Sequence, residues 1–134
     1  WGDAKPGNMI FDHCEVAAIL DWELSGVGAP EEDLAHWFAV DWFLSEGQSV
    51  ARLSGLPGYK VSIDQYVEHA PCDEAAVKWW FAFSLVRMAI IFERARLVTA
   101  KQQQRQWPNL LIPRLTDIVN DVIWRQYTDQ KAFR

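Results

Sequence analysis

The sequence contains little cysteine and no concentrated charge of either sign. Its two cysteines, Cys14 and Cys72, lie far apart and form no metal-binding or redox motif, which favours reduced thiols and a cytoplasmic protein over a disulfide scaffold. No run of five or more like charges occurs, and the formal net charge is −5. Because nucleic-acid binding favours a basic face, we expect no nucleic-acid partner.

Long apolar runs, repeats and low-complexity segments are also absent. The most apolar stretch, from Trp79 to Phe92, is broken by Ser84 and Arg87 and is too short to span a bilayer. No signal peptide is visible, so we expect a soluble protein without a membrane partner. Residue 1 is Trp rather than Met, which leads us to expect a fragment of a longer polypeptide.

What the sequence does contain is ordinary globular material that is rich in tryptophan. Half of the 134 residues are hydrophobic and 23% are charged, which is enough for one compact domain. Eight residues are Trp, and such large side chains need a core, an interface or a ligand pocket to cover them.

Short apolar runs near the start predict a β-hairpin. Residues 1–7 contain two glycines and a proline and are expected to form a loop. Residues 8–11 and 16–20 are apolar and are separated by four mostly polar residues, as in two strands joined by a tight turn. The second strand ends at Asp21.

Helices are expected over the rest of the chain. Pro30 begins one that ends near residues 44–45, with acidic residues in its first turn, and residues 47–60 are expected to be irregular. The other expected helices cover residues 63–69 with Ser62 as N-cap, residues 73–101 and residues 110–127. The helix over residues 73–101 is apolar nearly all round, as in the centre of a domain. The predicted class is therefore α+β and mostly helical.

Three oxygen-bearing side chains carry the strongest functional signal. Asp3 and Asn8 form an Asp-x-x-x-x-Asn pattern in a loop, and Asp21 follows the second strand. A hairpin between Asn8 and Asp21 would return Asp21 to the level of Asn8. Phosphoryl transfer needs a carboxylate that orients the attacking hydroxyl and oxygen ligands for magnesium, and these three residues supply that set.

The same residues resemble a known family. The pattern Trp-Gly-Asp-x-x-x-x-Asn over residues 1–8 resembles the His-Gly-Asp-x-x-x-x-Asn catalytic loop of aminoglycoside phosphotransferases and choline kinase-like proteins. Residues 20–23, Leu-Asp-Trp-Glu, are similar to that family's metal motif, and Pro30 with Asp33 and the following Leu-Ala resembles its Gly-x-Pro-x-x-Asp-Leu-Ala segment. The later helices look like the branch related to kinase domains fused to acyl-CoA dehydrogenases.

The resemblance implies roles for individual residues. Asp3 would be the catalytic base, and Asn8 and Asp21 would hold Mg²⁺ and thereby the phosphates of ATP or GTP. Lys5 would neutralise charge that develops on the transferred phosphate. Asp33 would brace the catalytic loop by hydrogen bonds. The acceptor would be a hydroxyl group on a small molecule.

Two departures from the family pattern bear on these expectations. Trp1 stands where the family has its histidine, which supports the loop and is not the base. The family's Gly-rich loop and strand lysine, which bind ATP, are missing from residues 1–134. We therefore expect these residues to be the C-terminal lobe of a protein-kinase-like fold, without its N-terminal ATP-binding lobe and inactive alone.

Other interpretations stay open at this stage. The chain could be a non-catalytic kinase-like remnant, or a binding or oligomerisation module that forms a homodimer. Lys5 could be a solvated loop lysine, and Glu31 and Glu32 could simply be helix-start charges. His36 has no evident partner at metal-ligand spacing and is not expected to bind a metal. Arg87 could pair with neighbouring charges or face a substrate.

Overall fold

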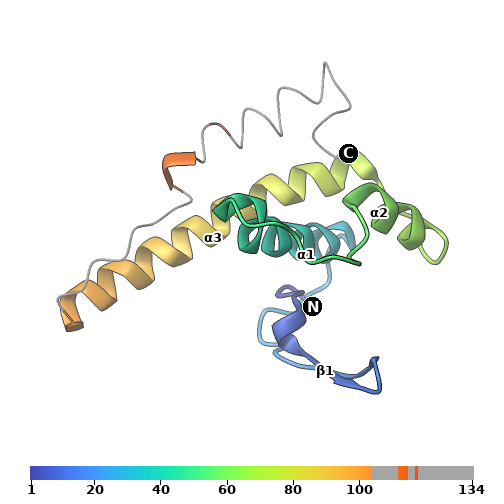
Figure 1. The fold of residues 1–134 in the computed structure, drawn as a ribbon, viewed down its shortest axis with the longest axis horizontal. Helices are drawn as coiled ribbons and strands as arrows, with labels where there is room; N and C mark the ends of the chain where they lie inside the picture. The colour runs from blue at the N-terminus through green and yellow to red at the C-terminus, as the bar shows by residue number, and fades with distance from the viewer. Residues whose placement is uncertain (104–111, 115–116, 118–134) are drawn as a thin grey trace.

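A two-stranded hairpin and three α-helices make up the described part of the chain. The computed structural model describes residues 1–103, 112–114 and 117. Figure 1 shows the hairpin extending away from the helices, while the long helix α3 crosses the whole molecule. This arrangement is the α+β, mostly helical class that the sequence predicts.

The hairpin forms as predicted, with strands shifted by one residue. A short 3-10 helix, Pro6–Asn8, leads into β1 (Met9–Asp12), which pairs antiparallel with β2 (Glu15–Ile19). His13 and Cys14 form the turn, and both have positive φ (47° and 67°), as the two central residues of a type I′ hairpin turn require. The register shifts by one residue between Ile10 and Phe11.

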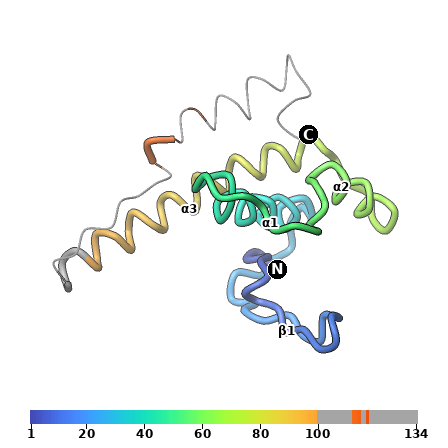
Figure 2. The backbone as a smooth tube through the Cα atoms, in the orientation of Figure 1, coloured from blue at the N-terminus to red at the C-terminus, as the bar shows by residue number. Residues whose placement is uncertain are grey.

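The helical core forms where α1 (Glu31–Leu44) packs against α3 (Glu74–Gln103). The tube in Figure 2 follows the two helices as they lie alongside each other above the hairpin. Phe38 from α1 meets Val77 and Leu85 from α3, and these are among the most deeply buried side chains of the described residues. Burial of such side chains stabilises the fold by about 1.5–3 kcal/mol each, before entropy is counted.

The connection between α1 and α3 departs from the sequence prediction. A 3-10 helix, Glu46–Gln48, is followed by α2, which spans Tyr59–Val67 with Gly58 as N-cap. The predicted start after Ser62 is wrong, since Ser62 lies inside α2. Tyr59 packs its ring 5.0 Å from that of Phe38, so contact with the core favours a helix that already begins at Tyr59.

The predicted helix over residues 73–101 is confirmed as α3, whereas most of the one predicted over residues 110–127 lies outside the described residues. By length and composition alone, Glu74–Thr99 would be long enough and apolar enough to cross a membrane, and it is wider than the apolar stretch from Trp79 to Phe92. The central helix of a globular core has the same composition. In this structure α3 supplies six of the ten residues of the buried core.

Candidate active site

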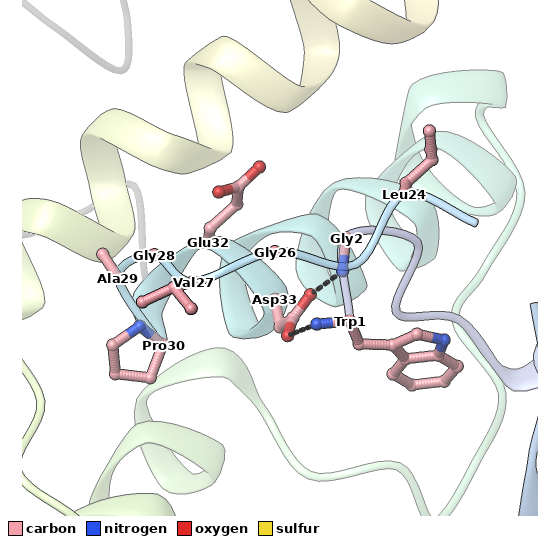
Figure 3. A pocket seen from close by; sticks show the side chains of 10 residues that line it. All are labelled: Trp1, Gly2, Leu24, Gly26, Val27, Gly28, Ala29, Pro30, Glu32 and Asp33. Atoms are coloured by element: carbon pink, nitrogen blue, oxygen red, sulfur yellow. Dashed lines mark hydrogen bonds and ion pairs between the residues drawn. The ribbon is translucent and has the colours of Figure 1, made fainter. Parts of the chain in front are cut away.

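The loop at residues 1–5 is held against the start of α1 by Asp33. The Asp33 carboxylate accepts a hydrogen bond from the Gly2 amide at 2.6 Å and contacts the Trp1 amino group at 2.9 Å. Figure 3 shows Asp33 reaching from α1 to both nitrogens, beneath the glycine-rich segment that runs from Leu24 to Pro30. Asp33 therefore makes the bracing contact that the family resemblance implies.

Asp3 and Asn8 contact each other directly. The Asn8 side-chain amide donates to the backbone oxygen of Asp3 at 3.0 Å and to its Oδ2 atom at 2.9 Å. Lys5 Nζ lies 2.5 Å from the same Oδ2 atom, so Lys5 is an ion-pair partner of Asp3 in this structure and not an isolated solvated lysine. The turn at Pro6–Asn8 makes this possible, because it brings Asn8 back toward Asp3.

Asp21 directly follows Leu20, whose backbone is hydrogen-bonded to that of Asn8. The Leu20 amide donates to the Asn8 carbonyl oxygen at 2.8 Å, and the Leu20 carbonyl accepts from Trp1 Nε1 at 2.8 Å. Asp21 itself has a positive φ of 59°, which turns the chain away from the strand. The Trp1 side chain, which stands where the resembled family has a histidine, thus links the loop that contains Asp3 to the segment that carries Asp21.

Asn8 and Asp21 fit a magnesium site by their chemistry. The Nδ2 atom of Asn8 is directed at Asp3, which leaves its Oδ1 atom available to a cation, and the Asp21 side chain is exposed. Mg²⁺ takes carboxylate and amide oxygens and keeps several waters. Within residues 1–103, 112–114 and 117, no group of three or more His, Cys, Asp and Glu gathers, so any ion here would need phosphate or water as additional ligands.

Two residues whose partners the sequence left undecided join the site. His36 Nε2 lies 3.2 Å from Asp3 Oδ1, and Arg87 Nη2 lies 2.9 Å from His36 Nδ1. Arg87 also donates to the Gly2 carbonyl at 3.0 Å and pairs with Glu32 at 3.4 Å. Glu32 is therefore more than a helix-start charge, because it connects α1 to α3.

These contacts set the charges in the site. Burial alone would raise the pKa of Asp3, but hydrogen bonds from Lys5 and Asn8 outweigh it and hold this pKa below its usual value of 3.8. Burial and the positive charge of Arg87 lower the pKa of His36 below 6.5, against the opposing effect of Asp3. At neutral pH, Asp3 is a carboxylate and His36 is an uncharged ring.

A cavity of about 330 Å³ opens beside Asp3. One end carries polar side chains, including Asp3, Lys5 and Arg87. Its remaining walls are apolar and come from α1, α3 and the segment after β2: Leu24, Val40, Phe43, Leu44, Met88, Ile91 and Phe92. A small molecule in this cavity would place its polar end at Asp3 and its apolar part between the two helices.

The sequence predicted part of this arrangement and missed part of it. The structure brings Asp3, Lys5 and Asn8 together and places Asp21 one residue from the Asn8–Leu20 hydrogen bond; their catalytic and metal-binding roles stay predictions. His36 and Arg87 were not predicted as site residues. The sequence does contain an indication for His36. It lies three residues after Asp33, so the two side chains share one face of the helix, the face that meets the loop.

Comparisons with known proteins agree with the motif. Residues 1–61 match the model of the phosphotransferase enzyme family. This chain is 34% identical over 99 residues to acyl-CoA dehydrogenase family member 11 of Pongo abelii and to that of Homo sapiens, and each alignment covers 66% of this chain. Acyl-CoA dehydrogenase family member 10 of Mus musculus is 27% identical over 146 aligned positions, covering 99% of this chain.

The chain spans only 12% of the length of the two member 11 proteins and 13% of the member 10 protein. No solved structure matches it significantly. The matches confirm the predicted likeness to the branch of the family that is related to acyl-CoA dehydrogenases.

Proposed function

We propose, because residues 1–61 match the model of the phosphotransferase enzyme family, that the chain is the catalytic part of an ATP-dependent kinase for a small molecule. One observation carries this proposal. Asp3 is an ionised carboxylate that is bonded to Asn8 and lies at the polar end of a cavity of about 330 Å³. A carboxylate that is held in this way is suited to orient a hydroxyl group for attack on a phosphate.

In the proposed reaction, a hydroxyl of the acceptor binds at Asp3. Its oxygen forms a bond to the γ-phosphorus of ATP while the bond from that phosphorus to the bridging β–γ oxygen breaks, and ADP leaves. The hydroxyl proton passes to the Asp3 carboxylate. Lys5, which pairs with Asp3 in this structure, is close enough to offset negative charge on the transferred phosphoryl group.

Asn8 Oδ1 and the Asp21 carboxylate would hold Mg²⁺. When bound, the ion supplies positive charge that bridges and neutralises the nucleotide phosphates. The hydrogen bond from the Leu20 amide to the Asn8 carbonyl keeps the two ligand-bearing segments at one level of the hairpin. GTP could serve in place of ATP, because these residues would contact only the phosphates.

The cavity favours an uncharged or anionic acceptor with an apolar part. Phe43, Met88 and Ile91 contribute apolar walls, and the cationic side chains of Lys5 and Arg87 lie at the polar end. A polycationic aminoglycoside would need an acidic pocket instead. We therefore propose a hydroxylated metabolite as acceptor and do not infer antibiotic resistance from the family name.

The proposed enzyme would be a longer protein that contains this chain as one of its parts. Residues 1–134 would form the C-terminal lobe of a protein-kinase-like fold, and an N-terminal lobe in the same polypeptide would bind the nucleotide. The composition fits a cytoplasmic protein that binds neither nucleic acid nor membrane. By itself the chain would be inactive.

The test is phosphate transfer by the full-length protein that carries this chain. ADP formation from Mg²⁺-ATP is measured alone and with a panel of hydroxylated metabolites, for the wild type and for Asp3→Asn and Asp21→Asn. Both variants should lose at least about 100-fold in kcat, the usual range for a lost general base or metal ligand. Asp64→Asn, at an exposed carboxylate of α2, is the matched control and should keep wild-type rates. Near wild-type turnover by Asp3→Asn would refute the proposal.

A second function of another class has an observation in its favour. The hairpin exposes several large apolar side chains, among them Ile10, Phe11 and Val16, which would suit a binding or homodimerisation surface. A non-catalytic module of this kind would bind no Mg²⁺-ATP. It would change its oligomeric state when Phe11 is replaced by Glu, which sedimentation can measure.

A further inference from the structure

We propose, on the basis of the function proposed above, that His36 and Arg87 are positioning residues for the Asp3 carboxylate. Arg87 holds His36 in its neutral tautomer with hydrogen on Nε2, and His36 donates that hydrogen to Asp3 Oδ1. Neither residue belongs to the Asp-x-x-x-x-Asn pattern or to the metal motif.

The tautomer follows from the chemistry of arginine. A guanidinium group has only donors, so the contact of 2.9 Å between Arg87 Nη2 and His36 Nδ1 requires Nδ1 to be the acceptor. The ring hydrogen of neutral His36 is therefore on Nε2, where Asp3 Oδ1 lies 3.2 Å away. His36 is 5% exposed, which leaves the ring little contact with water.

The hydrogen bond from His36 completes the set of donors around the carboxylate. Oδ2 of Asp3 already contacts Lys5 Nζ and Asn8 Nδ2, which lie on the loop itself. His36 approaches Oδ1 from α1, a separate element. With one oxygen held by the loop and the other by the helix, rotation of the carboxylate is restricted, which is the condition for orienting a hydroxyl.

Arg87 ties this arrangement to the long helix. It lies on α3, donates to the Gly2 carbonyl at 3.0 Å, and pairs with Glu32 on α1. The loop, α1 and α3 thus all meet at one guanidinium group. Movement of α3 relative to α1 would change the position of the His36 ring and, through it, the position of Asp3.

The location of the pair favours a role beyond packing. His36 and Arg87 line the same cavity as Asp3, whose other walls on α1 and α3 are largely apolar. Buried polar and charged groups are often less stabilising than apolar residues of similar size. An apolar pair would fill this position equally well if stability alone were at stake.

The first test reads the tautomer without any need for activity. The ¹⁵N chemical shifts of the His36 ring are measured in the full-length protein at neutral pH, with His36→Gln to assign the signals. We expect a neutral ring with hydrogen on Nε2, and a mixture of tautomers in Arg87→Met. A ring with hydrogen on Nδ1, or a cationic ring, in the wild type would overturn the proposal.

The second test separates positioning from folding. His36→Phe fills the space without a donor and should lower kcat for Mg²⁺-ATP turnover about 10- to 100-fold, with KM for ATP unchanged. His36→Gln keeps an N–H group near the position of Nε2 and should recover part of that loss. Equal rates for the His36→Phe variant and the wild-type protein, or equal losses in the two His36 variants, would overturn the positioning role.

A control identifies which proposal has failed. Arg52→Met removes a partly buried ion pair with Asp41, neither of whose residues lines the cavity, and should lower stability without lowering kcat. If Asp3→Asn also has no effect on turnover, then the phosphotransferase function itself is refuted. If Asp3→Asn abolishes turnover while His36→Phe does not change it, then only the positioning role is refuted.

Discussion

Gly2 lies against the backbone of Leu24 with no room for a side chain. A Cβ atom at Gly2 would be 2.9 Å from the Leu24 carbonyl carbon and closer still to its oxygen, and the φ angle of Gly2 is +88°. Only glycine adopts this conformation without strain. The same residue donates to Asp33 and accepts from Arg87, so its position decides where the loop before Asp3 lies.

Gly2→Ala should therefore lower the free energy of unfolding by about 1–3 kcal/mol, through strain and loss of the close contact. The measurement is urea denaturation followed by tryptophan fluorescence. Gly7→Ala is the matched control, because a Cβ there meets nothing within 4 Å and should change stability little. A Gly2→Ala protein as stable as the wild type would contradict the tight approach.

Leu85 of α3 is fully buried in the core between α1 and α3. Leu85→Ala would leave a cavity and should cost about 2–5 kcal/mol of unfolding free energy. Ile90, on the same helix but 65% exposed, provides the control, and Ile90→Ala should cost far less. Similar losses of unfolding free energy in both variants would show that α3 does not pack against α1 through the face that carries Leu85.

Arg52 and Asp41 join the irregular segment to α1. Arg52 Nε and Nη2 donate to Asp41 Oδ2 at 2.9 Å and 2.5 Å, and the guanidinium lies 4.7 Å from the centre of the Tyr59 ring. Arg52→Met should cost about 1.5–3 kcal/mol, as expected for a charged hydrogen bond that is partly buried.

The exposed pair of Lys60 and Asp64 on α2 gives the comparison for Arg52. Lys60→Met should change stability far less than Arg52→Met does, because surface ion pairs contribute little. Thermal unfolding at low and high salt checks both variants. If the Arg52→Met protein is no less stable than the Lys60→Met protein, the partly buried pair contributes no more to stability than the exposed one, and the prediction is wrong.

The lowered pKa of His36 gives stability a defined dependence on pH. In the folded protein this pKa lies below the ordinary value of 6.5, so the unfolded chain binds the extra proton first as the pH falls. The contribution of neutral His36 to stability is complete above pH 6.5 and decreases from there down to the folded pKa. Melting temperature measured between about pH 5 and 8 should show this decrease, and His36→Gln should remove that part of it.

Sequence patterns were sufficient for the fold elements whose signals are local. The hairpin follows from apolar runs around a polar turn, and the start of α1 follows from Pro30 and the acidic residues after it. The start of α2 could not be predicted, because it depends on the contact of Tyr59 with Phe38, a residue that is distant in sequence. Propensity alone carries no information about such a contact.

The same distinction applies to the candidate site. Asp3 and Asn8 are five residues apart, so their contact could be inferred from the motif. The contact of Arg87 with His36 depends on how α3 packs on α1, which no local pattern reveals. The pairing of Glu32 with Arg87 depends on the same packing, so the sequence offers only a helix-start interpretation for Glu32.

The hydrogen bond from Arg87 to the Gly2 carbonyl joins residues 85 positions apart in the sequence. Closing such a long loop costs entropy that the docking of α3 repays in part, so residues 1–5 should become fully ordered late in folding. The Gly2 carbonyl should then lose this hydrogen bond whenever α3 separates from α1. The short motif over residues 1–8 is therefore held partly by a helix that lies far outside it in the sequence.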